Sequence, residues 1–377
     1  MKNLLTNLVL FVVTTLAMLG LSEVVVRQFL DPLDYLLPIT VSDPELGHRI
    51  APNTGGHDAW GFRNKSLPSK AKIVILGDSM IYGTASTYDS SIPSILRKDL
   101  GAEVYGMALG GYGAPHYSML LDRALGLSPE TVVVGLSFGN NFMHAFNFVY
   151  DPDHQKFASL RLAKFSGSDT FKPVTIDEIP PFSVKAVRDW LARHSVLYRA
   201  VTIKLNFDAV RVREQQKSGD VILSIVDKKG GIITGIPLRA ASLVDLSDPR
   251  IQEGVRISLL LIDEMKKKCD ARSVKFAVLL LPTRFSTFQA ELMNSPQYPA
   301  EARKAVENET ALFDTLHAAL DQKGIWTIDV RKPLQDAVNQ QNRIYPVNDG
   351  HPNAVGNGVI ASYLAGELTA TKSKQDK

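Results

Sequence analysis

The sequence predicts an α/β protein in which helices cover both faces of a doubly wound parallel sheet. Two observations favour this fold class. Short apolar or β-branched runs, with the length of buried strands, alternate along the chain with amphipathic helical patterns. Several of these runs end in glycine and polar residues, which is typical of strands that present functional groups at their carboxyl ends. We therefore expect a three-layer α/β/α sandwich.

The predicted elements follow one another in a regular order. The strand candidates are Ile73–Leu76, Val104–Ala108, Val132–Leu136, Val274–Leu281 and Ile325–Val330. The clearest helical patterns are Ile92–Leu100, His116–Leu125, Val255–Lys268 and Ala302–Gln322. We expect the domain to cover about residues 71–370 and to be followed by a polar tail, residues 371–377, with fraying from Thr369 onward.

The composition limits the kinds of partner and site. With 377 residues, of which 45% are hydrophobic, the chain can bury at least one large core. The formal charge of +3 is spread over the chain, and no dense block of Lys and Arg contains interleaved aromatics, so we do not expect a nucleic-acid partner. Cys269 is the only cysteine, which excludes an intramolecular disulfide and a multi-cysteine metal site.

The N-terminal residues predict a membrane anchor. No charged residue lies between Lys2 and Glu23, and Leu4–Leu21 approaches the roughly 20 apolar residues needed to cross a bilayer. A signal peptide cleaved near Gly20-Leu21-Ser22 is the alternative, but apolar residues resume at Val24–Val26, which favours a retained single-pass anchor. Lys2 and the free amino group favour a cytoplasmic N-terminus. The rest of the chain would then face the periplasm or the cell exterior.

Two segments lie outside the alternation. Residues 31–70, which follow the anchor of residues 1–30, contain several Pro and Gly residues without a sustained period. We expect them to form an irregular lead-in on the domain surface. Between about residues 142 and 250 the sequence shows one amphipathic helix, Val184–Leu205, and two β-branched runs around Lys228–Gly231 that predict a hairpin. This segment is too long for an ordinary loop, so we expect an insertion that forms a cap or a small subdomain.

Ser79 is the first candidate for a catalytic residue. In KIVILGDSMIYG, Lys72–Gly83, it follows a predicted strand and would lie at the carboxyl edge of the sheet. Catalysis by a serine needs a base, a group that orients the base, and donors for the oxyanion that develops. The alternative is that Asp78 or Ser79 only caps the next helix.

Three further motifs contain residues that suit the other roles. In LGGYGAPH, Leu109–His116, the glycines allow the backbone to approach a ligand and to direct an N–H into a cavity. In LSFGNNFMHAF, Asn140 and Asn141 follow the third strand, and an amide side chain can donate to the same oxyanion. In NDGHPNAVGNG, Asp349 precedes His351 by two residues and can hold the imidazole in the tautomer that accepts a proton.

Each of these motifs also has a purely structural interpretation. The glycines can form an ordinary turn, and Asn353 can cap the last helix. His116 and His144 lie beside the motifs and are possible substrate contacts, although a structural role in a loop also explains them.

In this order, Gly77-Asp78-Ser79, Gly111, Gly139-Asn140 and Asp349-x-His351 resemble the motifs of the SGNH, or GDSL-type, hydrolase superfamily. The resemblance extends from about Lys70 to Leu368, apart from the insertion, and implies a flavodoxin-like α/β/α sandwich.

The resemblance implies a role for each matched residue. Ser79 would be the nucleophile, His351 the base and later the acid, and Asp349 the orienting carboxylate. The backbone N–H groups of Ser79 and Gly111 and the side chain of Asn140 would form the oxyanion hole. No metal or organic cofactor is implied. The expected activity is that of a serine esterase acting on an acyl ester, such as an O-acetyl or lipid ester.

Three positions depart from the commonest family pattern. Asn348 stands three residues before His351, where aspartate is usual, and Asp349 follows one step later, as in relatives that handle acetyl groups on extracellular polysaccharides. Asn141 replaces a usual aspartate, and Gly106 replaces a frequent asparagine. An O-acyltransferase that modifies an extracellular polysaccharide and a non-catalytic envelope binding protein are the alternative functions.

Overall fold

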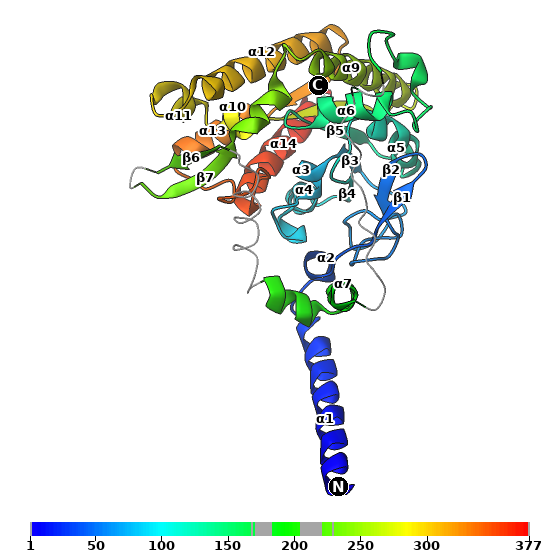
Figure 1. The fold of residues 1–377 in the computed structure, drawn as a ribbon. Coiled ribbons are helices and arrows are strands. Elements are labelled where there is room, and N and C mark those ends of the chain that lie inside the picture. Colours follow the sequence, from blue (N-terminus) through cyan, green and yellow to red (C-terminus); the bar gives the residue numbers. More distant parts are fainter. Residues whose placement is uncertain (1, 167–168, 170–182, 204–220, 228–229, 376–377) are drawn as a thin grey trace.

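A five-stranded parallel sheet forms the centre of the protein (Figure 1). The computed structural model describes residues 2–166, 169, 183–203, 221–227 and 230–375. In the order in which they lie in the sheet, the strands are β4 (Val104–Ala108), β3 (Ile73–Gly77), β5 (Thr131–Ser137), β8 (Lys275–Leu281) and β9 (Trp326–Asp329). The five predicted strands are thus confirmed. β3, β4 and β5 are buried along their whole length, as parallel strands covered on both faces must be.

Helices cover both faces of the sheet, so the fold is the expected three-layer sandwich. On one face α4 (Ile92–Leu100) packs against α14 (Ala354–Gln375). The other face carries α5 (Ala114–Gly126), α9 (Pro249–Asp270) and α12 (Ala300–Gln322) (Figure 1). Because β3 has β4 on one side and β5 on the other, the chain changes direction across the sheet at β3, and ligands bind at such a switch point.

Shorter elements complete the domain. They are η1 (Tyr88–Ser90), η2 (Ala158–Leu160), η4 (Leu238–Val244), α10 (Arg284–Thr287), α11 (Gln289–Asn294) and α13 (Arg331–Asn339). At the C-terminal end α14 continues to Gln375, and the predicted fraying of the polar tail stays a prediction. The Thr369 hydroxyl donates to the Ala365 carbonyl oxygen (2.9 Å). A threonine in a helix can make this bond to the residue four positions earlier while its backbone stays helical.

Residues 31–70 are more regular than the sequence predicted. They contain α2 (Pro32–Tyr35) and a hairpin of β1 (Thr40–Asp43) and β2 (Gly47–Ile50). Asn64 pairs with the edge strand β4, because its amide donates to the Gly106 carbonyl oxygen (2.9 Å) and accepts from the Gly106 N–H (3.3 Å). These contacts join residues 42 positions apart, which no local period reveals.

The predicted insertion, from about residue 142 to 250, is not one unit: its elements lie in different places on the domain. Its first residues belong to α6 (Asn141–Tyr150), which packs against α9 in the main domain, so the interruption of the sandwich begins only after this helix. The predicted hairpin is present as β6 (Ile222–Val226) and β7 (Ile232–Pro237), with positions 228–229 outside the described residues. The predicted long helix is divided into α7 (Val184–His194) and helical residues 196–203, and positions 204–205 lie outside the described residues.

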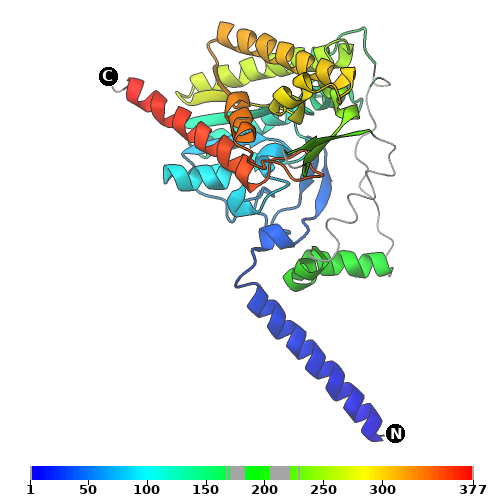
Figure 2. The ribbon, with the colours of Figure 1, turned by 90° about the vertical axis from the view of Figure 1, so that its left-hand side faces the viewer.

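α1 (Lys2–Val26) projects away from the domain (Figures 1 and 2). Residues Asn3–Val26 are long and apolar enough to cross a membrane, and none of the most apolar window is buried. A signal sequence near the N-terminus passes the same test of length and composition. The helix is therefore compatible with the predicted membrane anchor.

Candidate active site

Ser79 lies where β3 ends and the chain turns into the short helix α3 (Ser79–Tyr82). Asp78 caps this helix, because its carboxylate accepts a hydrogen bond from the Met80 N–H (2.9 Å). Gly83 ends the helix in the left-handed region (φ 78°), which glycine adopts without strain. Asp78 is thus the cap, and Ser79 is the first helical residue, whose N–H has no intrahelical acceptor.

Two glycines allow α3 to lie close to the sheet. A Cβ on Gly77 would overlap the Ile81 side chain, and a Cβ on Gly135, in the neighbouring strand β5, would lie 2.7 Å from Ile81 Cγ1. Ile81 therefore fills a space that exists only because both strands carry glycine there. A side chain at either position would displace α3, and Ser79 with it.

Asp78 is buried under α3 and is hydrogen-bonded to Asn141. Burial raises the pKa of Asp78 to about 6. The Asn141 amide donates to Asp78 Oδ2 (2.9 Å), while its carbonyl oxygen accepts from the Ser137 N–H (3.2 Å). An aspartate at position 141 would bring a second carboxylate against Asp78, so asparagine suits the buried acid of this chain.

His351 meets Ser79 at the carboxyl edge of the sheet. Its Nε2 lies 2.8 Å from Ser79 Oγ, and its Nδ1 lies 2.5 Å from Asp349 Oδ1. The same carboxylate oxygen accepts from the His351 backbone N–H (2.9 Å), which holds the loop in a tight turn. With Nδ1–H donated to Asp349, Nε2 is free to accept the serine proton. Of the two candidate orienting residues, Asp349 is the one that meets the second ring nitrogen.

The start of α14 holds the histidine loop in place. Asn353 caps the helix as predicted, because its side-chain oxygen accepts from two backbone N–H groups of the first turn (2.9 and 3.1 Å). Asn357 then donates to Ser86 Oγ and to the Ser90 carbonyl oxygen (2.9 Å each). These bonds connect the segment that follows α3 to the helix that follows His351.

The loop after β4 lies against Ser79. A Cβ on Gly110 would be 3.7 Å from Ser79 Cβ, and Gly111 has a φ of 87°, which favours glycine. His48 of β2 covers this loop, with Nε2 2.9 Å from the Gly110 carbonyl oxygen. Sequence reasoning missed His48, because 62 positions separate it from Gly110 and no motif surrounds it.

A pocket of about 160 Å³ lies at the candidate active site. Its lining includes Ser79, Asn140, His351 and Arg284. Asn140 precedes α6 but makes no capping hydrogen bond with its side chain. Arg284 follows β8 and donates to the Gly235 carbonyl oxygen in β7, and burial lowers the pKa of its guanidinium. Sequence reasoning missed Arg284, although its place just after a strand is the signal that singled out Ser79 and Asn140.

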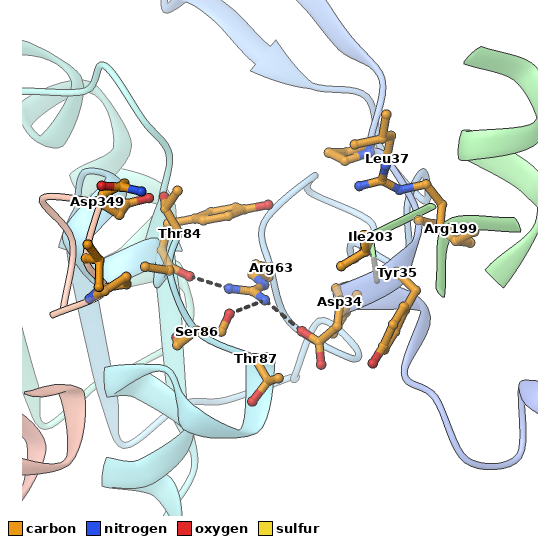
Figure 3. Close-up of a pocket in the computed structure, with 18 residues that line it drawn as sticks. Asp34, Tyr35, Leu37, Arg63, Thr84, Ser86, Thr87, Arg199, Ile203 and Asp349 are labelled. Carbon is orange, nitrogen blue, oxygen red and sulfur yellow. Dashed lines mark hydrogen bonds and ion pairs between the residues drawn. The ribbon is translucent and has the colours of Figure 1, made fainter. Parts of the chain in front are cut away.

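A larger cavity of about 670 Å³ lies beside the loop that precedes His351 and is bordered by Asp349 (Figure 3). Inside it, the Arg63 guanidinium pairs with the Asp34 carboxylate (2.7 Å) and donates to backbone carbonyl oxygens between positions 82 and 86. Arg199 and Ile203 line the cavity on the side away from Asp349 (Figure 3). Both the lead-in and the insertion thus contribute side chains near the candidate site.

His116 has a structural role. It is buried, its Nδ1 accepts from the Gly113 N–H (3.1 Å) at the start of α5, and its ring stacks on Tyr112 with 4.5 Å between centroids. Burial lowers the pKa of both His116 and His144. Of the two suggested roles, the structural one fits His116.

Within the described part of the chain, no group of three or more His, Cys, Asp or Glu side chains could hold a metal ion. Cys269, the single cysteine, is buried.

Comparison with known proteins confirms the resemblance to SGNH hydrolases. Residues 243–377 match the family described as "ALGX: SGNH hydrolase-like domain, acetyltransferase AlgX". The matched part contains Asp349 and His351 but not Ser79. Among curated proteins, no sequence matches.

Several solved structures are distantly similar. Phospholipase A1 from Streptomyces albidoflavus NA297 is 13% identical, with a TM-score of 0.42, 78% of this chain covered and 98% of that chain. A GDSL-like lipase from Bacteroides thetaiotaomicron VPI-5482 is 12% identical (TM-score 0.36; 81% and 93% covered). The acetyl xylan esterase AlAXEase is 10% identical (TM-score 0.37; 78% and 99% covered). Similarities as distant as these say nothing about the reaction.

Proposed function

We propose that this SGNH hydrolase-like protein is a serine esterase that cleaves an acyl ester through a covalent acyl-enzyme. The hydrogen-bonded series from Asp349 through His351 to Ser79, with distances of 2.5 and 2.8 Å, carries the proposal. A serine hydroxyl is a weak nucleophile unless an oriented base takes its proton, and this series supplies both the base and its orienting group. As the substrate class we assign an O-acetyl ester or a lipid acyl ester.

In the proposed acylation, Ser79 Oγ attacks the ester carbonyl carbon while its proton moves to His351 Nε2. Asp349 keeps the imidazole oriented and stabilises the imidazolium that forms. The bond to the alcohol oxygen then breaks, and His351 returns the proton to that oxygen. In the second half, a water molecule gives a proton to His351 and attacks the acyl carbon. The bond to Ser79 Oγ then breaks, His351 returns the proton to Oγ, and the acid leaves.

The proposed oxyanion hole consists of the Ser79 N–H, the Gly111 N–H and the Asn140 amide. Gly111 and Asn140 follow β4 and β5, the two strands on either side of β3, so their donors lie at the same sheet edge as Ser79. Removing one such donor raises the barrier by about 3 kcal/mol.

The test compares the full-length protein with Ser79→Ala and His351→Ala on an activated short-chain ester. We expect each variant to lose about 10³-fold or more of kcat/KM, because triad members act as a unit. His317→Ala, which alters a half-exposed histidine on α12, is the control and should leave hydrolysis unchanged. Hydrolysis that persists in Ser79→Ala would contradict the assignment. A serine-reactive fluorophosphonate that fails to label Ser79 in the wild type would instead favour a non-catalytic binding protein.

Transfer of the acyl group to a sugar hydroxyl is the second candidate function. It is favoured by the match of residues 243–377 to a family whose description names an acetyltransferase. Esterase and acyltransferase share the acyl-enzyme and differ in whether water or an acceptor reaches it. Incubation with an acetyl donor and polysaccharide oligomers, followed by mass spectrometry, separates them. Acetylated oligomers that form faster than free acetate indicate a transferase, and acetate release unaffected by the oligomers indicates an esterase.

We also propose that α1 is a retained anchor and that the domain faces the periplasm or the cell exterior. The uncharged apolar stretch Leu4–Leu21 and the preceding Lys2 support this orientation. Protease added to spheroplasts should digest the domain, while the membrane fraction should retain the intact N-terminus. A mature chain that begins after Ser22, or a domain that is protected from protease, would contradict the proposal.

A further inference from the structure

Two helices of the insertion connect the domain to α1. Glu23 of α1 accepts hydrogen bonds from the N–H groups of Val196 (2.8 Å) and Leu197 (3.0 Å), at the start of the helical residues 196–203. Arg27 donates to the carbonyl oxygen of His194 (2.7 Å), the last residue of α7. The two helices are therefore attached to α1 where its apolar stretch ends.

α7 has one face toward the domain and an apolar face away from it. Ala192 is buried, and its carbonyl oxygen accepts from the Leu37 N–H (3.0 Å) in the lead-in. Val184, Val187 and Trp190 are exposed, with 71%, 58% and 58% of their surface accessible. A spacing of three residues places these side chains along one side of a helix. Within the part of the chain that the structure describes, the His194 ring stacks on Trp190 with 4.9 Å between centroids, and the stripe as a whole stays exposed.

The position of α7 suits a contact with a membrane surface. In two views related by a turn of 90°, α1 leads away from the domain, and α7 lies near the place where α1 leaves it (Figures 1 and 2). α7 runs obliquely to the direction of α1 (Figure 2). When α1 crosses a bilayer, α7 therefore lies on the side of the domain that faces that bilayer.

Basic side chains accompany the apolar stripe. Lys185 and Arg188, directly after Val184 and Val187, are exposed. A helix with an apolar face and basic residues beside it lies at the boundary between headgroups and acyl chains, where the cations meet anionic lipids. Tryptophan is enriched at this depth because its ring is apolar and its N–H is polar.

We propose that the stripe of Val184, Val187 and Trp190 lies in the interfacial layer of the bilayer that α1 spans, in contact with phospholipid. This inference rests on the proposed retention of α1 and is independent of the proposed ester chemistry. One transmembrane helix alone leaves an attached domain free to tilt, whereas a second contact fixes its orientation. Residues 196–203 also supply Arg199 and Ile203 to the 670 Å³ cavity, so the contact holds this cavity near the membrane surface.

The test uses the full-length protein, one copy per nanodisc, in phosphatidylcholine with phosphatidylglycerol. Trp60→Phe and Trp326→Phe together leave Trp190 as the only tryptophan, and Trp60→Phe with Trp190→Phe leaves Trp326 as the matched control. Lipids brominated at the upper acyl carbons quench tryptophans that reach this depth. We expect Trp190 to lose most of its emission and to shift to shorter wavelength relative to the same protein in detergent, and Trp326 to change little.

The proposal would be overturned if brominated lipid quenches Trp190 emission no more than it quenches Trp326 emission. A single copy per disc excludes a second protein molecule as the cover of the stripe. The readout does not involve ester hydrolysis, so a failure of the proposed reaction leaves this result intact.

A second measurement covers the case in which the tryptophan variants fold poorly. Val187→Cys carries a nitroxide label, and the one native cysteine, Cys269, is buried and does not compete for it. We expect oxygen, which concentrates in the bilayer, to relax the label more strongly than a water-soluble nickel chelate does. Preferential relaxation by the nickel chelate would place the stripe in water and contradict the proposal.

Discussion

Asp349→Asn is the substitution that tests the candidate triad most directly. The variant keeps the shape of the side chain and removes the charge that lies 2.5 Å from His351 Nδ1. An amide can turn its N–H₂ toward Nδ1, which would select the tautomer whose Nε2 carries a proton and cannot accept one from Ser79. We expect a large loss of activity without loss of the fold.

The magnitude follows from the charge that forms during acylation. The imidazolium and the Asp349 carboxylate would have their charge centres about 4 Å apart, which at an effective dielectric constant of about 20 is worth about 4 kcal/mol. This free energy corresponds to a loss of about 10³-fold in kcat. Asp349 is almost fully buried, with 8% of its side chain exposed, so solvent screens the pair only weakly.

The assay is kcat/KM for an activated short-chain ester, together with the rate at which a fluorophosphonate labels Ser79. Asn348→Ala is the control, because Asn348 occupies the family's usual position for the orienting acid, and we expect it to retain most of the activity. The reasoning is refuted if Asp349→Asn retains more than about a tenth of the wild-type rate. It is equally refuted if Asn348→Ala loses as much activity as Asp349→Asn.

Three further substitutions test the surroundings of the site and the packing of the domain. Asn141→Asp brings a second carboxylate against Asp78, and we expect a lower melting temperature at pH 8 than at pH 5, because one member of the pair must hold a proton. Burial raises the pKa of Glu309 to about 7 from an unfolded value of 4.5, so its contribution to stability is complete below pH 4.5 and is lost as the pH rises through about 7. Glu309→Gln should therefore flatten the fall of the unfolding free energy over that range, measured by denaturant titration. Gly254→Ala places a methyl group in overlap with the Phe142 carbonyl oxygen between α9 and α6, and thermal unfolding should show a loss of about 1–3 kcal/mol.

Two of these predictions have a contrary outcome of their own, and the third has a matched control. An Asn141→Asp protein with the same melting temperature at both pH values would mean that the Asp78 site is open to water. If the unfolding free energy of Glu309→Gln falls with pH as steeply as that of the wild type, the fall comes from other groups, first of all Asp78. Gly126→Ala, at the end of α5, is the control for Gly254→Ala and should not destabilise the protein, because no atom beyond its chain neighbours and its own helix backbone lies within 4 Å of the new methyl group.

The five strands and the candidate triad were predictable because the signals for them are local. A buried parallel strand needs an uninterrupted apolar run, and the chain must turn directly after it, so Gly77-Asp78-Ser79 marks a strand end by itself. Carboxyl ends of parallel strands share one edge of the sheet, and this brings Ser79 and Asn140 together from distant parts of the sequence. The helix cap at Asn353 is also a local signal, since it bonds to the next turn of the chain.

The sequence by itself determined the sandwich, the position of Ser79 and the choice of Asp349 as the candidate that orients the histidine. Only the tertiary structure shows that Asp349, and not Asn348, meets the ring, because a shift of one residue in a tight turn changes which side chain points at it. It also brought His48 and Arg284 to the site. His48 comes from a segment whose own sequence shows no period or motif of catalysis, whereas Arg284 follows a predicted strand. The positions of both depend on packing between parts of the chain that are far apart in sequence.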